Sequence, residues 1–349
     1  MNKNLTKLIT SAAVALAMGS SVNAQSSQNK ACPPAPFEQG YGISNDKFPA
    51  AYNAPARVDV QQSWDIFFTG SYTYWYVDEA GFDLARNVTT TTDESVLFQN
   101  NSYSSGFKVG VGVDFGFDSW VGFAEYTWLR NSSSTGTNTV VTSADFVKSN
   151  LFGPGLSSVT VAGNRSINMD MVDATLSRPF YEGRKMTLLP YSGLRAAWIR
   201  QKFTGTVATA TQNTHSNSNS WAVGPRAGVA AHWMLGWGFR FEGDMGASVL
   251  YQSYKASVQQ VAVALNSGNQ NHLAPVADMC VGLGWGSYLD RQNYHLDFVA
   301  TYDFMNWWGQ NFIRQTADQL HNLSTQGTSG ADAGSLQISG LTITARFDF

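Results

Sequence analysis

Charge, cysteine and long apolar runs are all scarce in this sequence. Only 13% of the 349 residues are charged and only two are cysteine, whereas about a quarter of an ordinary soluble protein is charged. Beyond the first 24 residues no run approaches the roughly 18 to 20 consecutive apolar residues that a membrane-spanning helix requires. A bundle of transmembrane helices is therefore not expected.

Apolar and aromatic residues are nevertheless abundant. Hydrophobic residues make up 43% of the chain, aromatic residues 13%, and there are 32 glycines, which excludes a disordered protein. Because the mean hydropathy is only −0.19, the apolar residues must be interleaved with polar ones. This combination is typical of β-structure, including membrane barrels.

The N-terminus has the pattern of a secretory signal peptide over residues 1–24. Lys3 and Lys7 form a basic start, residues 8–18 are apolar, and small residues end at Val22-Asn23-Ala24, so cleavage is expected after Ala24. An N-terminal helical anchor is the alternative, but the apolar stretch is too short to span a bilayer.

The mature chain then divides into two parts. Residues 25–63 are rich in Pro, Ala, Asn and Gln and predict a periplasmic leader, and residues 64–349 carry the regular pattern described next. Loss of Lys3 and Lys7 lowers the formal charge from −3 to −5. No nucleic-acid partner is expected, because such binding depends on a basic excess.

The two cysteines, Cys32 and Cys280, both lie in the exported part, where a disulfide can persist. Cys32 belongs to a proline-rich stretch of the leader and Cys280 to a predicted strand. One intramolecular bridge, intermolecular pairing and two free thiols all remain open.

The region from residue 64 onward alternates apolar and polar residues with a period of two. In residues 106–117, for example, Phe107 and Val111 share one face while Lys108 and Asp114 share the other. Such alternation predicts strands with one apolar face, and lengths of about 9 to 15 residues suit a tilted bilayer crossing. The segments with this pattern are 64–77, 106–117, 120–130, 166–180, 186–203, 221–234, 238–251, 274–285, 293–304 and 335–349.

The connections between these segments alternate in length. The short ones are 118–119, 181–185, 235–237 and 286–292, and the long polar ones are 78–102, 131–165, 204–220, 252–273 and 305–334. Short periplasmic turns and long extracellular loops are typical of an outer-membrane barrel. Within the long loops, residues 309–323 have the spacing of a short helix.

The predicted fold is all-β: a transmembrane antiparallel outer-membrane β-barrel of at least 10 strands. If residues 159–162 and 257–265 form further hairpins, the number of strands rises to about 16. A soluble β-sandwich is the alternative, but aromatic residues gather near the strand ends, where the interfacial girdles of a barrel lie. Ten strands would leave a narrow or plugged lumen and sixteen an open one.

The last segment ends on an alternating apolar face that finishes with the terminal aromatic residue. This pattern resembles the signal that bacterial outer-membrane assembly machinery reads, and it also needs a strand partner to cover its edge. The residues of this predicted assembly signal are Leu341, Ile343, Ala345, Phe347 and Phe349.

Several short motifs resemble a known family, the Legionella and Chlamydia-type major outer membrane protein-like pore formers. They cover about residues 60–349, most tightly from residue 166. The motifs are Arg178-Pro179-Phe180-Tyr181, Pro190 to Arg195, Gly224-Pro225-Arg226, Phe241-Glu242-Gly243, Tyr294-His295-Leu296, Trp307 to Asn311, and Leu341 to Phe349.

The resemblance implies a porin in the outer membrane of a Gram-negative cell. Chlamydial members are rich in cysteine and form a cross-linked envelope network, whereas this chain has two cysteines. The resemblance therefore implies the porin role and puts the cross-linked structural role in doubt.

Charged residues of the strands fall on the face opposite the apolar one, which in a barrel lines the lumen. Charges there hold water and weight the passage of ions by sign, so we expect passive diffusion of small hydrophilic solutes and ions. A salt bridge that holds the wall is the alternative role for each. These pore-lining candidates are Asp65, Lys108, Asp114, Asp173, Arg195, Arg226, Arg240, Glu242, Asp244, Asp278, Asp297, Asp303 and Arg346.

Enzymatic chemistry is not expected. The five histidines, His215, His232, His272, His295 and His321, show no spacing that pairs them with an acid and a nucleophile. No two of them lie within five residues, and the cysteines are too far apart in sequence to suggest a metal site. The glycines at 110, 112 and 116 belong to a strand rather than to a phosphate loop, so we expect no cofactor.

The alternative function is that of a surface-exposed adhesin or structural major outer membrane protein that acts through its long loops. The expected partners are outer-membrane lipid including lipopolysaccharide, the barrel assembly machinery, small hydrophilic solutes, a host-cell surface, and further copies of the chain in a homo-oligomer. An outer-membrane enzyme is the third and weakest hypothesis.

Overall fold

The computed structural model describes residues 60, 65–88, 94–115, 120–140, 147–149, 151, 153–156, 159–182, 185–207, 212–260, 264–325 and 333–349. The predicted signal peptide, nearly all of the predicted leader, and Cys32 lie outside these residues. The elements are β1 Ile66–Glu79, β2 Asp83–Val88, β3 Glu94–Phe98, β4 Ser102–Asp114, β5 Val121–Val140, β6 Val147–Ser149, β7 Gly153–Leu156, β8 Val159–Ser177, β9 Tyr181–Glu182, β10 Met186–Val207, β11 Gln212–Gly236, β12 Phe239–Gln259, β13 Ala264–Asn266, β14 Gln270–Leu289, the 3-10 helix η1 Asp290–Gln292, β15 Tyr294–Asn311, α2 Phe312–Thr325 and β16 Gly334–Asp348.

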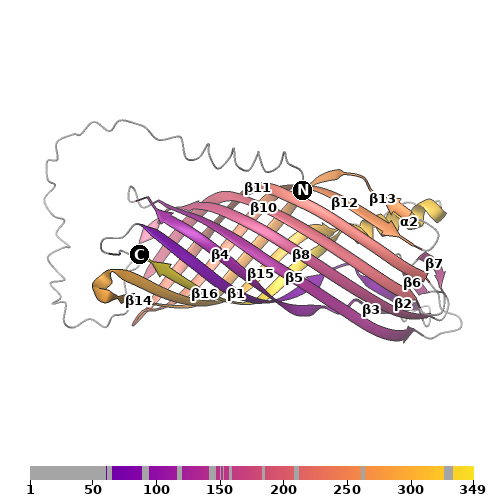
Figure 1. Ribbon diagram of the computed structural model, residues 1–349, viewed down its shortest axis with the longest axis horizontal. Helices are drawn as coiled ribbons and strands as arrows, with labels where there is room; N and C mark the ends of the chain where they lie inside the picture. The colour runs from indigo at the N-terminus through magenta and orange to yellow at the C-terminus, as the bar shows by residue number, and fades with distance from the viewer. Residues whose placement is uncertain are drawn as a thin grey trace. The chain divides into compact units, whose positions relative to one another are not determined.

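Ten long antiparallel strands close into a barrel, which confirms the predicted fold class (Figure 1). The strands follow one another around the barrel in the order β1, β4, β5, β8, β10, β11, β12, β14, β15 and β16, and β16 pairs with β1 to close it. Each of the ten segments predicted from alternation corresponds to one of these strands. The short hairpins β2–β3 and β6–β7 form separate sheets and do not add to the barrel.

Three of the predicted long loops are wrong in their extent, because strands continue through them. β5 reaches Val140 and β8 begins at Val159, β10 and β11 leave only residues 208–211 between them, and β12 runs to Gln259. These extensions are rich in Ser, Thr and Asn and carry no apolar outward face, so their sequence resembles a loop. They are strands nonetheless, because each pairs in register with its neighbours.

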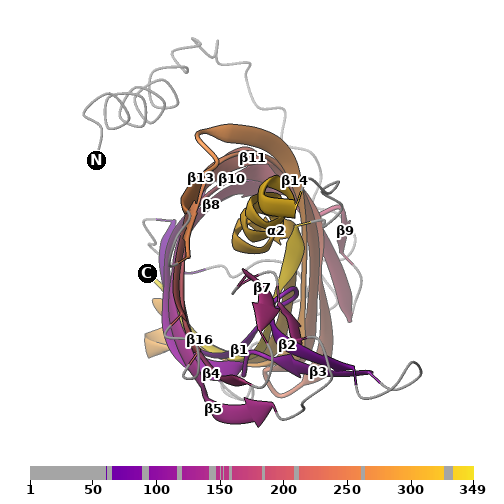
Figure 2. The same cartoon turned by 90° about the vertical axis from the view of Figure 1, so that its right-hand side faces the viewer.

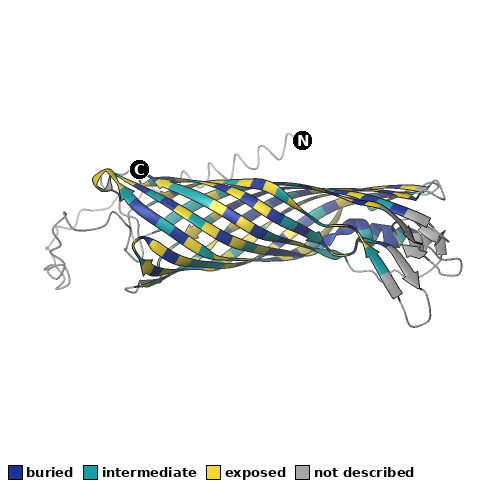
Figure 3. Ribbon diagram, turned by 90° about the horizontal axis from the view of Figure 1, so that it is seen from below, coloured by how far each residue is buried: buried dark blue, intermediate teal, exposed yellow. Residues whose placement is uncertain are grey.

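Exposure alternates along much of the long strands, as in β12, so the barrel surface is a checkerboard of exposed and buried residues (Figure 3). The outward apolar residues include Val111 at 40% exposure, Val281 at 44% and Ile343 at 47%. Since each of these would be buried in a soluble protein, together they form the belt that faces lipid. The strand ends carry stacked outward aromatic pairs, such as Tyr74 on Tyr103 at 5.0 Å between ring centroids.

The lipid-facing belt gives the first prediction. Val109→Arg places a charge near the middle of β4 on the outward face, where Val109 is 48% exposed, and we expect it to lower the free energy of unfolding by about 2–4 kcal/mol. Urea titration of the barrel refolded into lipid vesicles measures this change. Ser105→Arg, also outward on β4 but close to the aromatic pair, is the matched control and should cost at most about 1 kcal/mol; equal losses for the two variants would contradict the position of the belt.

The end of the barrel at which β11 passes into β12 has short connections in the described part of the chain. Gly236, Trp237 and Gly238 all have positive φ, which allows β11 to pass into β12 in a two-residue turn. The C-terminal Phe349 lies at this end, with its ring stacked on Phe68 at 5.7 Å. An even strand count puts both ends of the barrel chain on this side, so it is the periplasmic side.

A helix follows β15, as the spacing predicted. α2 lies inside the ring of strands at the extracellular mouth (Figure 2). Within the described part of the chain, no helix is long and apolar enough to cross a membrane.

Candidate functional site

The periplasmic half of the barrel encloses a cavity of about 490 Å³, which we call the vestibule. All thirteen residues predicted to line the lumen line this single cavity. They converge because twelve of them occupy inward positions on the barrel strands and Asp65 directly precedes β1, and strand register brings those positions together. Their part in solute passage remains a prediction.

Four further titratable residues of the vestibule were not predicted from the sequence. Glu125, His232, His295 and Asp348 also line it. Glu125 belongs to a segment in which apolar residues occur on both faces, which obscured the alternation. Asp348 could have been found, because it lies opposite the apolar face of the last strand.

The vestibule carries an excess of negative charge. Ten carboxylates and five basic side chains line it, leaving five formal negative charges. Uncompensated charge is costly in a dry interior. The composition of the lining therefore requires water in the vestibule.

Ion pairs cross the lumen within the vestibule. Arg195 on β10 donates two hydrogen bonds to Asp173 on the adjacent β8, at 2.7 and 2.9 Å. It also donates to Asp278 on β14, which is three strands away, at 2.8 Å. Arg226 bonds the same Asp278 and lies 3.5 Å from Asp173. The four groups form an ion-pair network across the barrel, and the role of holding the wall remains a prediction for them.

Two further ion-pair networks also line the vestibule. Arg240 donates hydrogen bonds to Asp297, one of them 2.9 Å long, and to Glu242. Lys108 lies 3.7 Å from Glu125 and 3.5 Å from Asp303. These pairs tie β12 to β15 and β4 to β15, which are not neighbours in the barrel.

Two glycines of β4 accommodate aromatic rings rather than widening the channel. A Cβ at position 112 would lie 1.9 Å from the Phe67 ring, and one at position 110 would lie 2.6 Å from the Phe123 ring. Phe67 and Phe123 stack at 5.8 Å, and the Arg346 guanidinium lies 3.6 Å above Phe67. The rings narrow the periplasmic end of the vestibule.

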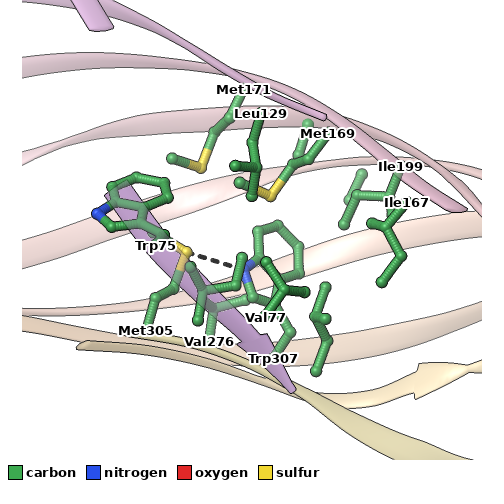
Figure 4. Packing of buried hydrophobic residues seen from close by; sticks show 14 of the residues in the cluster. Trp75, Val77, Leu129, Ile167, Met169, Met171, Ile199, Val276, Met305 and Trp307 are labelled. Atoms are coloured by element: carbon green, nitrogen blue, oxygen red, sulfur yellow. Dashed lines mark hydrogen bonds between the residues drawn. The ribbon is translucent and has the colours of Figure 1, made fainter. Parts of the chain in front are cut away.

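An apolar cluster closes the inner end of the vestibule, and we call it the constriction. Its side chains come from nine of the ten barrel strands and point toward one another across the lumen (Figure 4). Trp75 and Trp307 are 1% and 0% exposed; Trp307 donates to the Met305 sulfur at 3.0 Å and Trp75 to Thr342 at 3.0 Å. The members are Trp75, Val77, Leu129, Ile167, Met169, Met171, Ala197, Ile199, Ala222, Leu250, Val276, Met305, Trp307, Leu336 and Ile338.

A polar layer follows the constriction on its extracellular side. Glu79, Arg165 and Gln201 each lie two positions beyond a constriction residue on their strand, and the Gln201 amide donates to Glu79 at 2.7 Å. Arg165 lies 3.8 Å from the same carboxylate. Across the lumen, Gln252 donates to Gln310 at 2.7 Å. This buried layer separates the constriction from the mouth.

The mouth itself is capped by α2 and the β2 hairpin. Ile313, Ala317 and Leu320 of the helix pack with Phe82 and Phe203 in a second apolar cluster. The ring of Phe312 stacks on Tyr254 at 3.6 Å. The lumen is thus layered as a charged vestibule, an apolar constriction, a polar layer and an apolar cap.

The remaining predicted residues have definite places. Cys280 lies on the vestibule wall, and its pairing with Cys32 stays untested because Cys32 lies outside the described residues. Leu341, Ile343 and Phe347 of the C-terminal segment face outward, and their role in assembly remains a prediction. In the described ranges no group of three or more His, Cys, Asp or Glu residues is placed to hold a metal ion.

Comparisons with known proteins give one family. The model of the family described as Legionella pneumophila major outer membrane protein precursor matches residues 57–349. No curated protein matches the chain.

Solved structures give weaker similarities. The outer membrane protease OmpT from Escherichia coli has 11% identity and a TM-score of 0.43, with 82% of this chain and 97% of that chain covered. The P. putida toluene transporter TodX has 7% identity and a TM-score of 0.20, with 84% of this chain and 94% of that chain covered. An anion-selective porin from Comamonas acidovorans has 8% identity and a TM-score of 0.13, with 81% of this chain and 98% of that chain covered. Because all three TM-scores are below 0.5, no property of these proteins is carried over to this chain.

Proposed function

Because the chain belongs to the family of the Legionella pneumophila major outer membrane protein, we propose that it forms a channel through the outer membrane for small hydrophilic solutes and ions. The observation that carries this proposal is the vestibule, a hydrated cavity with an excess of carboxylates that ends on an apolar constriction. Hydrophobic constrictions gate channels by excluding water. The conformation described here is therefore the closed state, and conduction requires the constriction to widen.

Reconstitution tests the channel. Purified mature protein in planar bilayers should give discrete conductance steps, and vesicles that contain it should swell in small sugars. Silence across several lipids and voltages, together with vesicles that stay impermeable, would remove the channel function.

The vestibule charge gives the second prediction. Asp244 lines the cavity and accepts a hydrogen bond from the Tyr191 hydroxyl at 2.9 Å. Because the lining has five excess negative charges, we expect a preference for cations, and Asp244→Asn should shift the reversal potential in a salt gradient toward zero. Asp114→Asn should act in the same direction.

Asp78→Asn is the matched control, since Asp78 lies beyond the belt, where its carboxylate accepts a hydrogen bond from Asn101 at 2.6 Å. The reversal potential of the Asp78→Asn variant should equal that of the wild type. An unchanged reversal potential for both vestibule variants would assign those carboxylates to the barrel wall.

A second function, adhesion or structural support at the cell surface, is favoured by the closed lumen and by the strands that extend beyond the belt. Replacing the β2–β3 hairpin with a short Gly-Ser linker tests it. Loss of host-cell binding with unchanged conductance would assign adhesion to this end of the molecule, and unchanged binding would remove the hairpin from that role.

A further inference from the structure

Basic residues gather on one side of the outer surface, at the extracellular edge of the apolar belt. On β5 the first outward residue after Trp128 is Arg130, and on β10 the first after Trp198 is Arg200, followed by Lys202. Arg130 and Arg200 are joined through β8, because Asn168 pairs with both of them. We call Arg130, Arg200 and Lys202 the basic strip.

The two arginines are organised around one carboxylate. Asp170 of β8 accepts two hydrogen bonds from Arg130, at 2.8 and 2.9 Å, and lies 4.0 Å from Arg200. The Tyr126 hydroxyl donates to the same carboxylate at 2.7 Å, and Arg130 lies 4.8 Å above the Trp128 ring. Three bases against one acid leave a net positive charge, and the Arg200 side chain is 61% exposed.

The opposite side of the barrel has no such charge. Within the described strands β1, β4, β14, β15 and β16, the lysines and arginines are Lys108 and Arg346, and both face the vestibule. A general need for solubility or for interfacial lysines would distribute basic residues around the whole barrel. Their restriction to one side indicates a specific anionic ligand.

We propose that the basic strip binds the phosphate groups of an acylated, phosphorylated glycolipid of the outer leaflet, that is, the lipid portion of lipopolysaccharide. The exposed Arg200 guanidinium can bind phosphate oxygens in a bidentate manner. Arg130 contributes its positive charge, because its terminal nitrogens already donate to Asp170 and to the Leu129 and Met169 carbonyls. Further along the outer wall toward the middle of the belt, beyond Trp198 and Ala196, outward Leu194 and Val223 are 58% and 41% exposed and offer an apolar wall for acyl chains. The basic strip lies at the edge of the apolar belt, so its position matches a ligand with phosphates above and acyl chains below. This inference does not depend on conduction.

Binding of purified bis-phosphorylated lipid A to the detergent-solubilised barrel, followed by native mass spectrometry, tests the proposal. Wild type should retain bound lipid A, and Arg130→Ala/Arg200→Ala should weaken its binding by at least about tenfold, as expected for the loss of two of the three positive charges of the strip. Lys185→Ala, which removes an exposed base from a periplasmic turn, should bind as the wild type does. Lipid A without phosphates should bind wild type as weakly as the double variant.

Two outcomes overturn the proposal. Equal retention of lipid A by the wild type and the double variant removes the strip as the site. Displacement of lipid A by millimolar inorganic phosphate alone shows that the site recognises free phosphate and not the lipid. Arg200→Gln with Lys202→Gln, both at exposed positions, serves as a second variant if the double alanine variant fails to show the heat-modifiable mobility of a folded barrel, and it should weaken binding in the same direction.

Discussion

Replacing both tryptophans of the constriction with alanine should turn a mostly closed channel into a constantly conducting one. Among the residues that the structure describes, Trp75 and Trp307 are the largest fully buried side chains, and they lie between the vestibule and the polar layer. Their removal leaves a gap that is large enough for water, which abolishes the apolar barrier. We expect the macroscopic conductance of Trp75→Ala/Trp307→Ala in planar bilayers to rise on the order of tenfold over the wild type.

Folding must be controlled, because each Trp→Ala change in a core costs about 3–5 kcal/mol. Leu129→Ser and Met169→Ser offer a milder route, since they wet the constriction without removing a large ring. Trp221→Ala is the matched control, because Trp221 faces outward at 40% exposure and should leave conductance unchanged. A folded double variant with wild-type conductance would show that the barrier lies elsewhere, with α2 and its cluster as the next site to open.

The sequence predicted the vestibule better than the constriction, and the reason is physical. The side-chain direction of a strand residue follows from its parity alone, so charges such as Asp114 and Arg240 could be assigned to the lumen without any knowledge of their neighbours. Inward apolar residues such as Leu129 and Met169 interrupt the alternation instead of extending it. Their meaning depends on what faces them across the barrel, and that is fixed only by strand number and register.

Cross-lumen ion pairs were hidden for the same reason. Arg195 and Asp278 are 83 positions apart, and their contact requires a barrel narrow enough for two side chains to span it. The strand extensions beyond the belt were missed because the alternation of apolar and polar residues ends where lipid ends. α2 was predicted, since Phe312, Ile313, Ala317 and Leu320 keep a helical spacing that needs only local sequence.

Arg240→Met should destabilise the barrel more than any other single change in the vestibule. The guanidinium of Arg240 bonds Asp297 through two nitrogens and Glu242 through a third. Its side chain is 6% exposed and that of Asp297 is 7% exposed. Removing it leaves the buried carboxylate of Asp297 and the partly buried carboxylate of Glu242 without their cation, and breaking a buried pair in this way costs about 3–5 kcal/mol. Guanidinium chloride unfolding of the refolded barrel, followed by tryptophan fluorescence, measures the loss.

Paired variants separate this effect from lost packing. Arg240→Met combined with Asp297→Leu and Glu242→Gln removes the stranded charges and should recover most of the lost stability, because an apolar replacement of a whole buried pair is close to neutral. Arg200→Met, which truncates a largely exposed arginine on the outer surface, should change the free energy of unfolding by less than about 0.5 kcal/mol. If Arg240→Met alone unfolds with the wild-type free energy, water in the vestibule solvates Asp297 and Glu242 without help, and the lining charges serve the passing solute instead of the wall.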